Sequence, residues 1–505
     1  MSEQTTITPD DTPKVPSLTT KVVRGAGWMF AGKFTGRALA AIKLIILARL
    51  LSPDDFGLFG IMMLATMALN TFTQTGFDKA LIQFPDDTES HLDTAWTIQI
   101  LRGVLLATVL FFSAPLIAWF FGEPRIIPLL QFFCIAPLIA GFDNIGIIYF
   151  KKDLHFKRQV FFSLSVDVVA MLVGVTLAII LRNVWALVWA TLSAGITRNV
   201  LSYALHPYRP RLRLRAESAR RLFGYGGWLL GSSILLFLSM KGDRIILGHL
   251  LGAYALGVFG MAWQFADLTT SQISDLLNHV MMPAYAKAQG ARERLARAFQ
   301  RVLEFVSTLA LPLTAFMVLA APEIVLGIIG DEWNDAIMPL RILSLAAFLR
   351  AIDATTTPLF LGTGRPRLQF WKNLARGVVT LALVYPLTVR YGVSGTALAG
   401  LVGVAALAPM MVWATRITGI SLTACTRALL PGLLLAACAG AGILLARLLP
   451  ITNPTLMLVA MVFLVASVAI PVAWGLYRAY DTGPFRLLKE GVAAADIKLP
   501  SWMES

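Results

Sequence analysis

The stretch that decides the fold runs from residue 24 to residue 60 and reads RGAGWMFAGKFTGRALAAIKLIILARLLSPDDFGLFG. Most of it is apolar enough to enter a bilayer, yet its apolar part carries Lys33, Arg37 and Lys43 and no acidic residue. A cation at membrane depth costs roughly 2.5–3.5 kcal/mol or more, so it normally faces protein or a water-filled cavity. Lys33 and Arg37 lie one turn apart on one helical face. We interpret them as candidate residues of a cationic cavity for an anionic ligand; the alternative is a tolerated charged helix whose cations reach the interface.

Small residues on the same helix predict a close neighbour. Gly32 and Gly36 form a small-xxx-small pair, which lets a second helix approach. A partial phosphate-loop pattern also begins here, but Phe34 stands where such a loop needs Ser or Thr, and the pattern lies inside one apolar helix. We therefore exclude nucleotide binding and expect no cofactor.

The opening stretch recurs 200 residues later. The shift superimposes identical residues without gaps: Gly27-Trp28 on Gly227-Trp228, Ile45-Ile46-Leu47 on Ile245-Ile246-Leu247, Leu50-Leu51 on Leu250-Leu251, and Gly57, Phe59 and Gly60 on Gly257, Phe259 and Gly260. The chain is therefore predicted to consist of two related halves that begin with the same helical hairpin. Such repeats are common in secondary transporters, where the substrate binds between the halves.

Composition indicates a multi-pass membrane protein. The 505 residues are 57% hydrophobic and 14% charged, with a mean hydropathy of +0.71. The net charge of +14 is explained by positive residues on the cytoplasmic side rather than by nucleic-acid binding. Three scattered cysteines and five dispersed histidines form neither a disulfide framework nor a metal site.

The hydropathy pattern predicts an all-α integral membrane protein with fourteen transmembrane helices: two pseudo-symmetric six-helix lobes plus two C-terminal helices. Lys and Arg concentrate on the side of the N-terminus, so both termini are predicted to be cytoplasmic, in the bacterial inner membrane. The predicted organisation is a tail at 1–20, an N-lobe at 21–205, a basic linker at 206–221, a C-lobe at 222–416, two further helices at 417–480 and a tail at 481–505. The segment 283–301 is predicted to be an amphipathic interfacial helix or an ordinary basic loop.

Two polar stripes fall on equivalent helices. The second span carries Asn70 and Gln74, and the eighth carries Gln264, Asp267 and Ser271, each set at helical spacing. Stripes of this kind line a cavity or join helices by hydrogen bonds. We list these five residues as candidates for substrate binding.

Charges in the seventh and tenth spans add further candidates. Lys241 and Arg244 share a face, while Asp243 pairs either with one of them or with a cation of the first helix. Arg350 and Asp353 lie three residues apart and are predicted to form a structural ion pair. The sequence shows no hydrolase or metalloprotease motif, so an enzyme is not expected.

Two sequence elements resemble a known family. The element Leu47 to Gly57 (LARLLSPDDFG), followed by Thr75-Gly76-Phe77 and Ala80 to Gln83, is similar to the opening of bacterial polysaccharide flippases. These are Wzx-type exporters, particularly the colanic-acid-exporter branch, in the superfamily that also contains multidrug exporters and the lipid II flippase. The second-half element Gly242 to Gly248 resembles that branch as well.

The resemblance implies alternating access that turns a polyprenyl-pyrophosphate-linked oligosaccharide (undecaprenyl-pyrophosphate type) from the cytoplasmic to the outer leaflet, for exopolysaccharide or lipopolysaccharide O-antigen synthesis. It implies contact with membrane lipids and brings in the polysaccharide polymerase and chain-length regulator as further partners; no nucleic acid is expected. Two alternatives remain: an ion-coupled multidrug exporter of the same fold, and a membrane polymerase or glycosyltransferase of the same pathway. The repeat unit and the coupling ion stay open.

Overall fold

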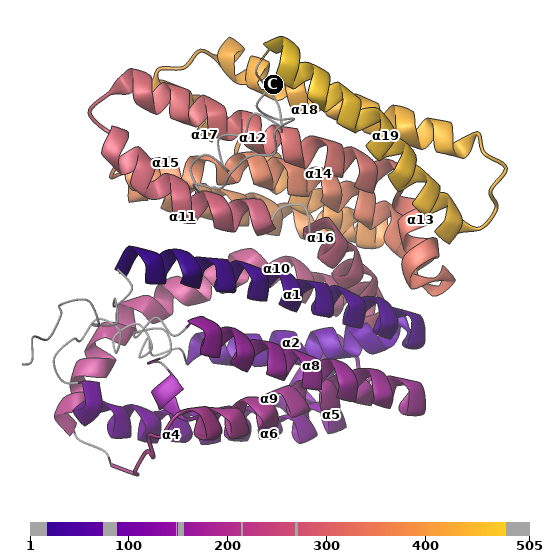
Figure 1. The fold of residues 1–505 in the computed structure, drawn as a ribbon. Helices are drawn as coiled ribbons and strands as arrows, with labels where there is room; N and C mark the ends of the chain where they lie inside the picture. Colours follow the sequence, from indigo (N-terminus) through magenta and orange to yellow (C-terminus); the bar gives the residue numbers. More distant parts are fainter. Residues whose placement is uncertain are drawn as a thin grey trace, which may run out of the picture.

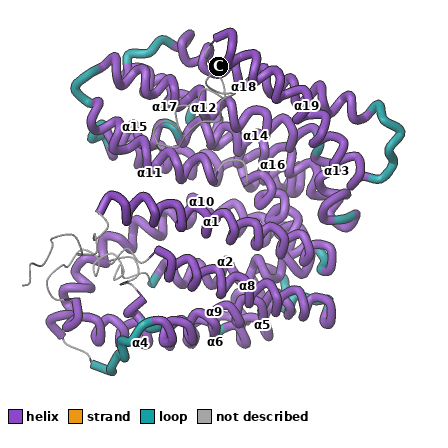
Figure 2. Tube along the Cα trace, viewed as in Figure 1, coloured by secondary structure: helices purple, strands orange, loops and turns teal. Residues whose placement is uncertain are grey.

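The computed structural model describes residues 18–73, 88–147, 149, 156–213, 216–267 and 271–480. These residues form helices and connecting turns, with no strand among them (Figure 2). The all-α membrane fold predicted from hydropathy is confirmed. The predicted tail at 481–505 and most of the tail at 1–20 lie outside the described residues.

The first half of the chain contributes the lower group of helices in Figure 1. It consists of α1 Leu18–Leu50, α2 Pro53–Phe72, α4 Thr88–Phe121, α5 Ile126–Phe133, α6 Ile135–Gly141, the 3-10 turn η1 Ile145–Ile147, α8 Phe156–Leu181 and α9 Trp185–Leu205.

The second half begins with α10 Ala216–Asp267 and forms most of the upper group. It continues with α11 Ser271–Ala288, α12 Arg292–Leu319, α13 Ala321–Ile324, the π-helix η2 Val325–Ile329, the 3-10 helix η3 Asp331–Ala336, α14 Ile337–Ala354, α15 Thr356–Gly362, α16 Pro366–Ala405 and α17 Ala408–Thr418, and is followed by α18 Leu422–Arg447 and α19 Pro454–Tyr480.

Two of the longest helices are helix pairs that reverse direction at a glycine. Gly252 in α10 and Gly392 in α16 adopt positive φ angles of 75° and 60°, a conformation that glycine reaches without a Cβ penalty. Eight helices among the described residues are long and apolar enough to cross a membrane. The predicted count of fourteen helices matches the structure. In this count the two arms of α10 and of α16 are separate helices, and consecutive shorter helices that continue one another, such as α5 with α6 and α14 with α15, count as one.

A capping box starts α2. Ser52 accepts a hydrogen bond from the Asp55 backbone N–H at 3.3 Å, and the Asp55 carboxylate accepts one from the Ser52 backbone N–H at 3.1 Å. Pro53 occupies the first helical turn, where its missing N–H costs nothing. This capping box ends α1 and reverses the chain into α2.

The structure assigns helix to much of two basic segments. The segment 283–301 is neither a separate interfacial helix nor a loop, because α11 continues to Ala288 and α12 starts at Arg292. The linker is extended at its start, where Tyr208 Oη donates to Asp93 Oδ1 at 2.5 Å, but α10 already begins at Ala216. In both segments apolar residues stand among the basic ones, after Gly290 and after Arg215. They continue the apolar pattern of α12 and of α10 toward the N-terminal end of each helix.

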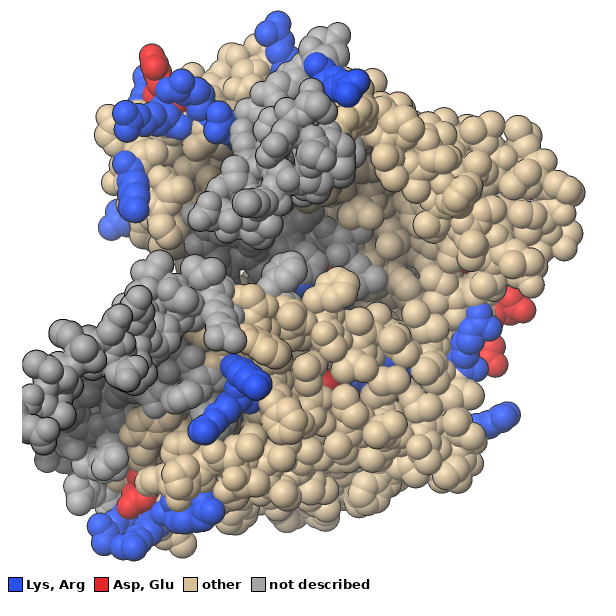
Figure 3. Space-filling model, viewed as in Figure 1, with Lys and Arg blue, Asp and Glu red and all other residues tan. Residues whose placement is uncertain are grey.

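The two halves meet at one end of the molecule and diverge at the other (Figure 1). The largest buried cluster joins them, with Ile61 and Met62 of α2, Phe259 of α10 and Trp333 of η3 all at most 1% exposed. Figure 3 shows a hollow between the halves at the other end, where blue basic side chains gather on the surface. We call these the closed end and the open end.

Candidate functional site

The glycines of α1 hold it against α8, as predicted. A Cβ on Gly32 would lie 2.5 Å from Val160 Cγ1, and one on Gly36 would lie 3.3 Å from Asp167 Oδ2. Small residues at both positions therefore allow the close approach of the two helices. Lys33 and Arg37 are exposed on the surface of α1.

Helix α8 provides a counter-charge for α1. Asp167 of α8 lies beside Gly36, and its electrostatic partner is Lys43 of α1. Asp243, by contrast, is surrounded by charges of the second half: Arg244, Lys241 and Arg350. The charges that act on Asp243 are therefore those of the second half, and a direct ion pair of Asp243 with one of its neighbours stays a prediction.

The polar stripe of α2 joins two helices. Arg102 of α4 donates to the Asn70 side-chain oxygen at 3.1 Å, to the Asn70 carbonyl at 3.0 Å and to Thr73 Oγ1 at 3.1 Å. Asn70 remains exposed at its surface. Gln74 lies outside the described residues, so this stripe keeps its cavity role only as a hypothesis.

The second half brings most of its predicted residues into one cluster. Arg244 and Trp263 are nineteen positions apart in α10, but the reversal at Gly252 places the Arg244 guanidinium 5.0 Å from the centre of the Trp263 ring. Arg350 of α14 approaches the same ring at 4.4 Å. The indole therefore stabilises two cations from different helices through its π face.

Both guanidinium groups keep a buried donor that makes no hydrogen bond to any described residue. Arg244 Nε and Arg350 Nη2 are buried and make no hydrogen bond. The nearest carboxylate oxygen to Arg350 Nη2, that of Asp267, is 3.9 Å away, which is too far for a hydrogen bond. Buried donors without acceptors cost free energy, and their presence is typical of a site that receives a ligand or water.

The charges of the cluster do not cancel. The Asp243 carboxylate accepts from the Arg244 backbone N–H at 2.8 Å, and the Asp267 side chain is 40% exposed. Three cations, Lys241, Arg244 and Arg350, lie near the carboxylates of Asp243 and Asp267. Arg376 adds a further positive charge near Arg350. The surplus of positive charge favours an anion of two negative charges.

The remaining predicted residues lie around the cluster. Gln264 is exposed beside Trp263 on the second arm of α10, and Lys241 is partly buried on the first arm. Ser271 is the first residue of α11, and its side chain is not described. Of the predicted site residues, the structure places four close enough to interact electrostatically: Lys241, Asp243, Arg244 and Asp267.

The predicted pair of Arg350 with Asp353 is replaced by two pairs between helices. Arg350 faces Asp267, and Asp353 Oδ2 lies 3.1 Å from Lys372 Nζ of α16. Lys372 is 1% exposed and also donates to Thr356 Oγ1 at 3.1 Å and Thr357 Oγ1 at 3.0 Å. A spacing of three allows a pair within one helix, but neighbouring helices present better placed partners here.

Sequence reasoning missed Trp263 and gave Arg350 a structural role only. The available signal was the spacing of Trp263 and Asp267, which lie one turn apart on the same helical face. The partnership of Trp263 with Arg350 carries no signal in the sequence, because the two residues come from separate helices.

Comparison with known proteins decides the family. The model of the family described as "Polysaccharide biosynthesis protein" matches residues 46–338, more than half of the chain. The chain belongs to this family. Its match includes α2, α10 with both of its arms, and the segment that leads into α14, so the family pattern covers every residue of the cationic cluster except Arg350 and Arg376.

Named relatives of the family cover most of the chain. The teichuronic acid biosynthesis protein TuaB of Bacillus subtilis is 24% identical over 71% of this chain and 74% of its own length. The lipopolysaccharide biosynthesis protein WzxC of Escherichia coli is 22% identical over 77% of this chain and 78% of its own length. The predicted resemblance to polysaccharide exporters is confirmed.

Solved structures show the same fold. The inward closed conformation of the lipid II flippase MurJ superimposes with a TM-score of 0.67 over 89% of this chain and 98% of that one, at 12% identity. An inward-facing transporter of the multidrug MATE family superimposes with a TM-score of 0.58 over 75% and 94%, at 17% identity. The family and its neighbours are transporters rather than enzymes, so a polymerase or glycosyltransferase is set aside.

Proposed function

We propose that the protein moves a polyprenyl-pyrophosphate-linked oligosaccharide from the cytoplasmic to the outer leaflet of the inner membrane by alternating access. The relatives support a transported saccharide, because their names refer to teichuronic acid, lipopolysaccharide and succinoglycan. These are different polymers, so we assign the shared part of the substrate to the lipid carrier rather than to one sugar.

The observation that carries the proposal is the cationic cluster around Trp263. A pyrophosphate diester carries two negative charges and several acceptor oxygens, which match the charge surplus and the unpartnered donors of Arg244 and Arg350. Guanidinium groups suit phosphate because their planar donors bind two oxygens at once. Asp267 would then hold Arg350 in place when the site is empty.

The other candidates are assigned to the same substrate. Lys33 and Arg37 of α1 would contact the pyrophosphate or acidic sugars, while Asn70, Gln74, Gln264 and Ser271 would hydrogen-bond sugar hydroxyls. In this arrangement the open end faces the cytoplasm together with both termini, and the lobes 21–205 and 222–416 rock about the closed end. A polymerase that consumes the flipped substrate would draw the reaction outward.

The test is transport by the purified protein in proteoliposomes that contain a fluorescent polyprenyl-pyrophosphoryl oligosaccharide. The fraction accessible to a membrane-impermeant quencher reports the rate of flipping. Each charge-assisted hydrogen bond is worth about 1.5–3 kcal/mol, so Arg244→Gln and Arg350→Gln should each lower the rate about ten- to a hundred-fold. Arg427→Gln, an exposed arginine of α18 outside the cluster, is the matched control.

Two results would contradict the proposal. Wild-type protein that does not move the labelled lipid, but does export a cationic drug, would favour the multidrug alternative. Equal rates for wild type and the Arg244→Gln, Arg350→Gln double variant would remove the cluster from the binding site. The double variant Lys33→Ala, Arg37→Ala tests the first helix in the same way.

A further inference from the structure

Two glycines of the repeat bring the backbones of the two halves into contact. A Cβ on Gly57 of α2 would overlap the carbonyl oxygen of Ala253 and lie 2.9 Å from its Cα. A Cβ on Gly257 of α10 would overlap the carbonyl oxygen of Pro53 and lie 3.0 Å from the Gly57 backbone nitrogen. Both obstacles are backbone atoms, which no change of rotamer can move.

These two contacts are exchanged by the 200-residue shift of the sequence. Pro53 corresponds to Ala253 and Gly57 to Gly257, so each glycine rests on the residue that precedes its counterpart by four positions. The starts of α2 and of the second arm of α10 therefore cross as an internal two-fold interface. In such an interface one surface meets its own equivalent.

Equivalent residues of the two halves also make hydrogen bonds across the interface beside this crossing. Arg49, at the end of α1, donates to the carbonyl of Ile328 at 2.7 Å and to that of Gly327 in the second half. Its counterpart His249 pairs with the carbonyl of Phe120 in the first half at 2.6 Å. Trp333 Nε1 adds a bond to the Ala48 carbonyl at 2.9 Å.

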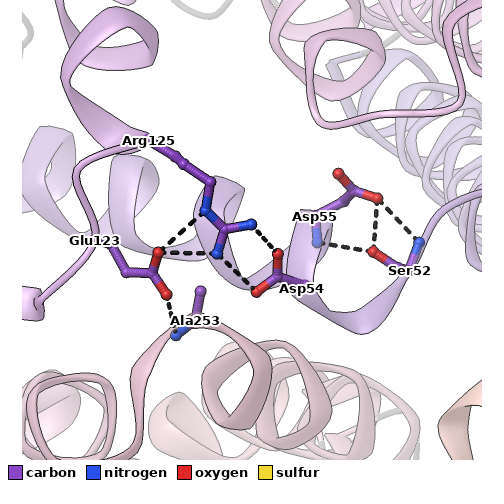
Figure 4. A network of polar contacts seen from close by, with 6 residues as sticks. All are labelled: Ser52, Asp54, Asp55, Glu123, Arg125 and Ala253. Carbon is purple, nitrogen blue, oxygen red and sulfur yellow. Dashed lines mark hydrogen bonds and ion pairs between the residues drawn. The ribbon is translucent and has the colours of Figure 1, made fainter.

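Figure 4 shows a charged network that fixes one side of the crossing. Arg125 lies 2.5 Å from Asp54 and 2.9 Å from Glu123, and these carboxylates raise the pKa of Arg125 above its usual range. Glu123 in turn accepts from the Ala253 backbone N–H at 3.4 Å. The network links the first turn of α2 to the residue on which Gly57 rests.

We propose that Gly57 and Gly257 form one symmetric contact that closes the outer end of the protein, and that this contact must separate during transport. The inference rests on alternating access but not on the identity of the substrate. Because the halves approach to backbone distance, a single methyl group at either glycine prevents closure. The internal symmetry further requires that the two substitutions act alike.

The repeat supplies matched controls. Gly60 and Gly260 also correspond under the shift, but a Cβ on Gly60 would lie 3.4 Å from a Leu256 methyl group and one on Gly260 would have nothing within 4 Å. Alanine at these positions has room and favours the helix. All four glycine-to-alanine variants therefore change the same atoms in equivalent helices and differ only in what the methyl group meets.

The experiment measures the distance between spin labels across the closed end of the full-length protein in nanodiscs, without substrate. Labels are placed at the exposed positions Leu181 and Thr452, in a background in which Cys134, Cys425 and Cys438 are replaced by alanine. Gly57→Ala and Gly257→Ala are expected to raise the ratio of open to closed distances about tenfold or more. Gly60→Ala and Gly260→Ala are expected to retain the wild-type distribution.

A wild-type distribution in Gly57→Ala or in Gly257→Ala overturns the proposal, as does a shift in only one of the two. Since the readout is a distance, failure of the substrate assignment would leave this result unchanged. If neither variant yields folded protein, Arg49→Met decides, because it removes the bonds to Gly327 and Ile328 without adding a clash. An unchanged distribution in that variant also refutes a separable outer contact.

Discussion

Replacing Lys372 by methionine is predicted to destabilise the second half strongly. The ammonium group is 1% exposed and lies 3.1 Å from Asp353 Oδ2, with the hydroxyls of Thr356 and Thr357 completing its contacts. Methionine keeps most of the apolar stem but leaves a carboxylate that is only 16% exposed. Breaking a buried ion pair on one side costs about 3–5 kcal/mol.

The partial exposure of Asp353 reduces this penalty, because water reaches one edge of the carboxylate. We therefore expect the free energy of unfolding to fall by about 2–4 kcal/mol. The measurement is an equilibrium unfolding titration in mixed micelles of a mild detergent and dodecyl sulfate, followed by helical circular dichroism. Lys287→Met, at an exposed lysine of α11, should change the free energy by less than about 0.5 kcal/mol.

A double variant separates two causes of the destabilisation: the loss of the Lys372–Asp353 attraction, and the carboxylate of Asp353 that is left without its cation. Lys372→Met combined with Asp353→Asn removes both charges, so it should regain more than half of the stability lost in the single variant. If the single variant unfolds at the wild-type detergent ratio, the pair contributes nothing to stability. If the double variant is no more stable than the single, the stranded carboxylate is not the cause.

Three further outcomes can be measured. Trp263→Leu removes the ring that both Arg244 and Arg350 face, and at about 0.5–2 kcal/mol for each cation–π contact it should slow oligosaccharide flipping in proteoliposomes roughly five-fold or more, with Trp263→Phe milder. Gly32→Val should lower the free energy of unfolding by about 1–3 kcal/mol, because its Cβ meets Val160, whereas Gly27→Ala, with nothing within 4 Å, should not. Arg447→Gln breaks the 3.1 Å pair with Glu323 at the surface, so the loss in the same titration should stay below about 1 kcal/mol.

The sequence predicted the fold well because the governing signals are local. Apolar runs of transmembrane length, the capping box at Ser52 and the 200-residue repeat each depend on residues close together or on identity at a fixed shift. The close approach of α1 to another helix followed from Gly32 and Gly36, although the sequence does not say that α8 is the neighbour.

The site was predicted only in part, because its decisive contacts join separate helices. Lys241, Asp243, Arg244 and Asp267 were recognisable as charges within apolar spans. Their organisation around Trp263 depends on the reversal at Gly252 and on the position of α14. For the same reason the pairing within one helix that spacing suggested for Arg350 gave way to Asp267.

The recurring glycines connect these two levels. The repeat pairs Gly57 with Gly257 and Gly60 with Gly260. Sequence identity does not tell which pair packs against backbone atoms and which pair has room for a side chain. In the structure, Gly57 and Gly257 rest on each other's helices, where the backbones of the two halves are in contact. Lys241, Arg244, Trp263 and Asp267 of the cationic cluster lie on the two arms of α10, the second of which carries Gly257. If this contact separates during transport as proposed, the arms of α10 that carry Arg244 and Trp263 are expected to move with it, so the state of the closed end and the shape of the proposed anion site would be coupled through α10.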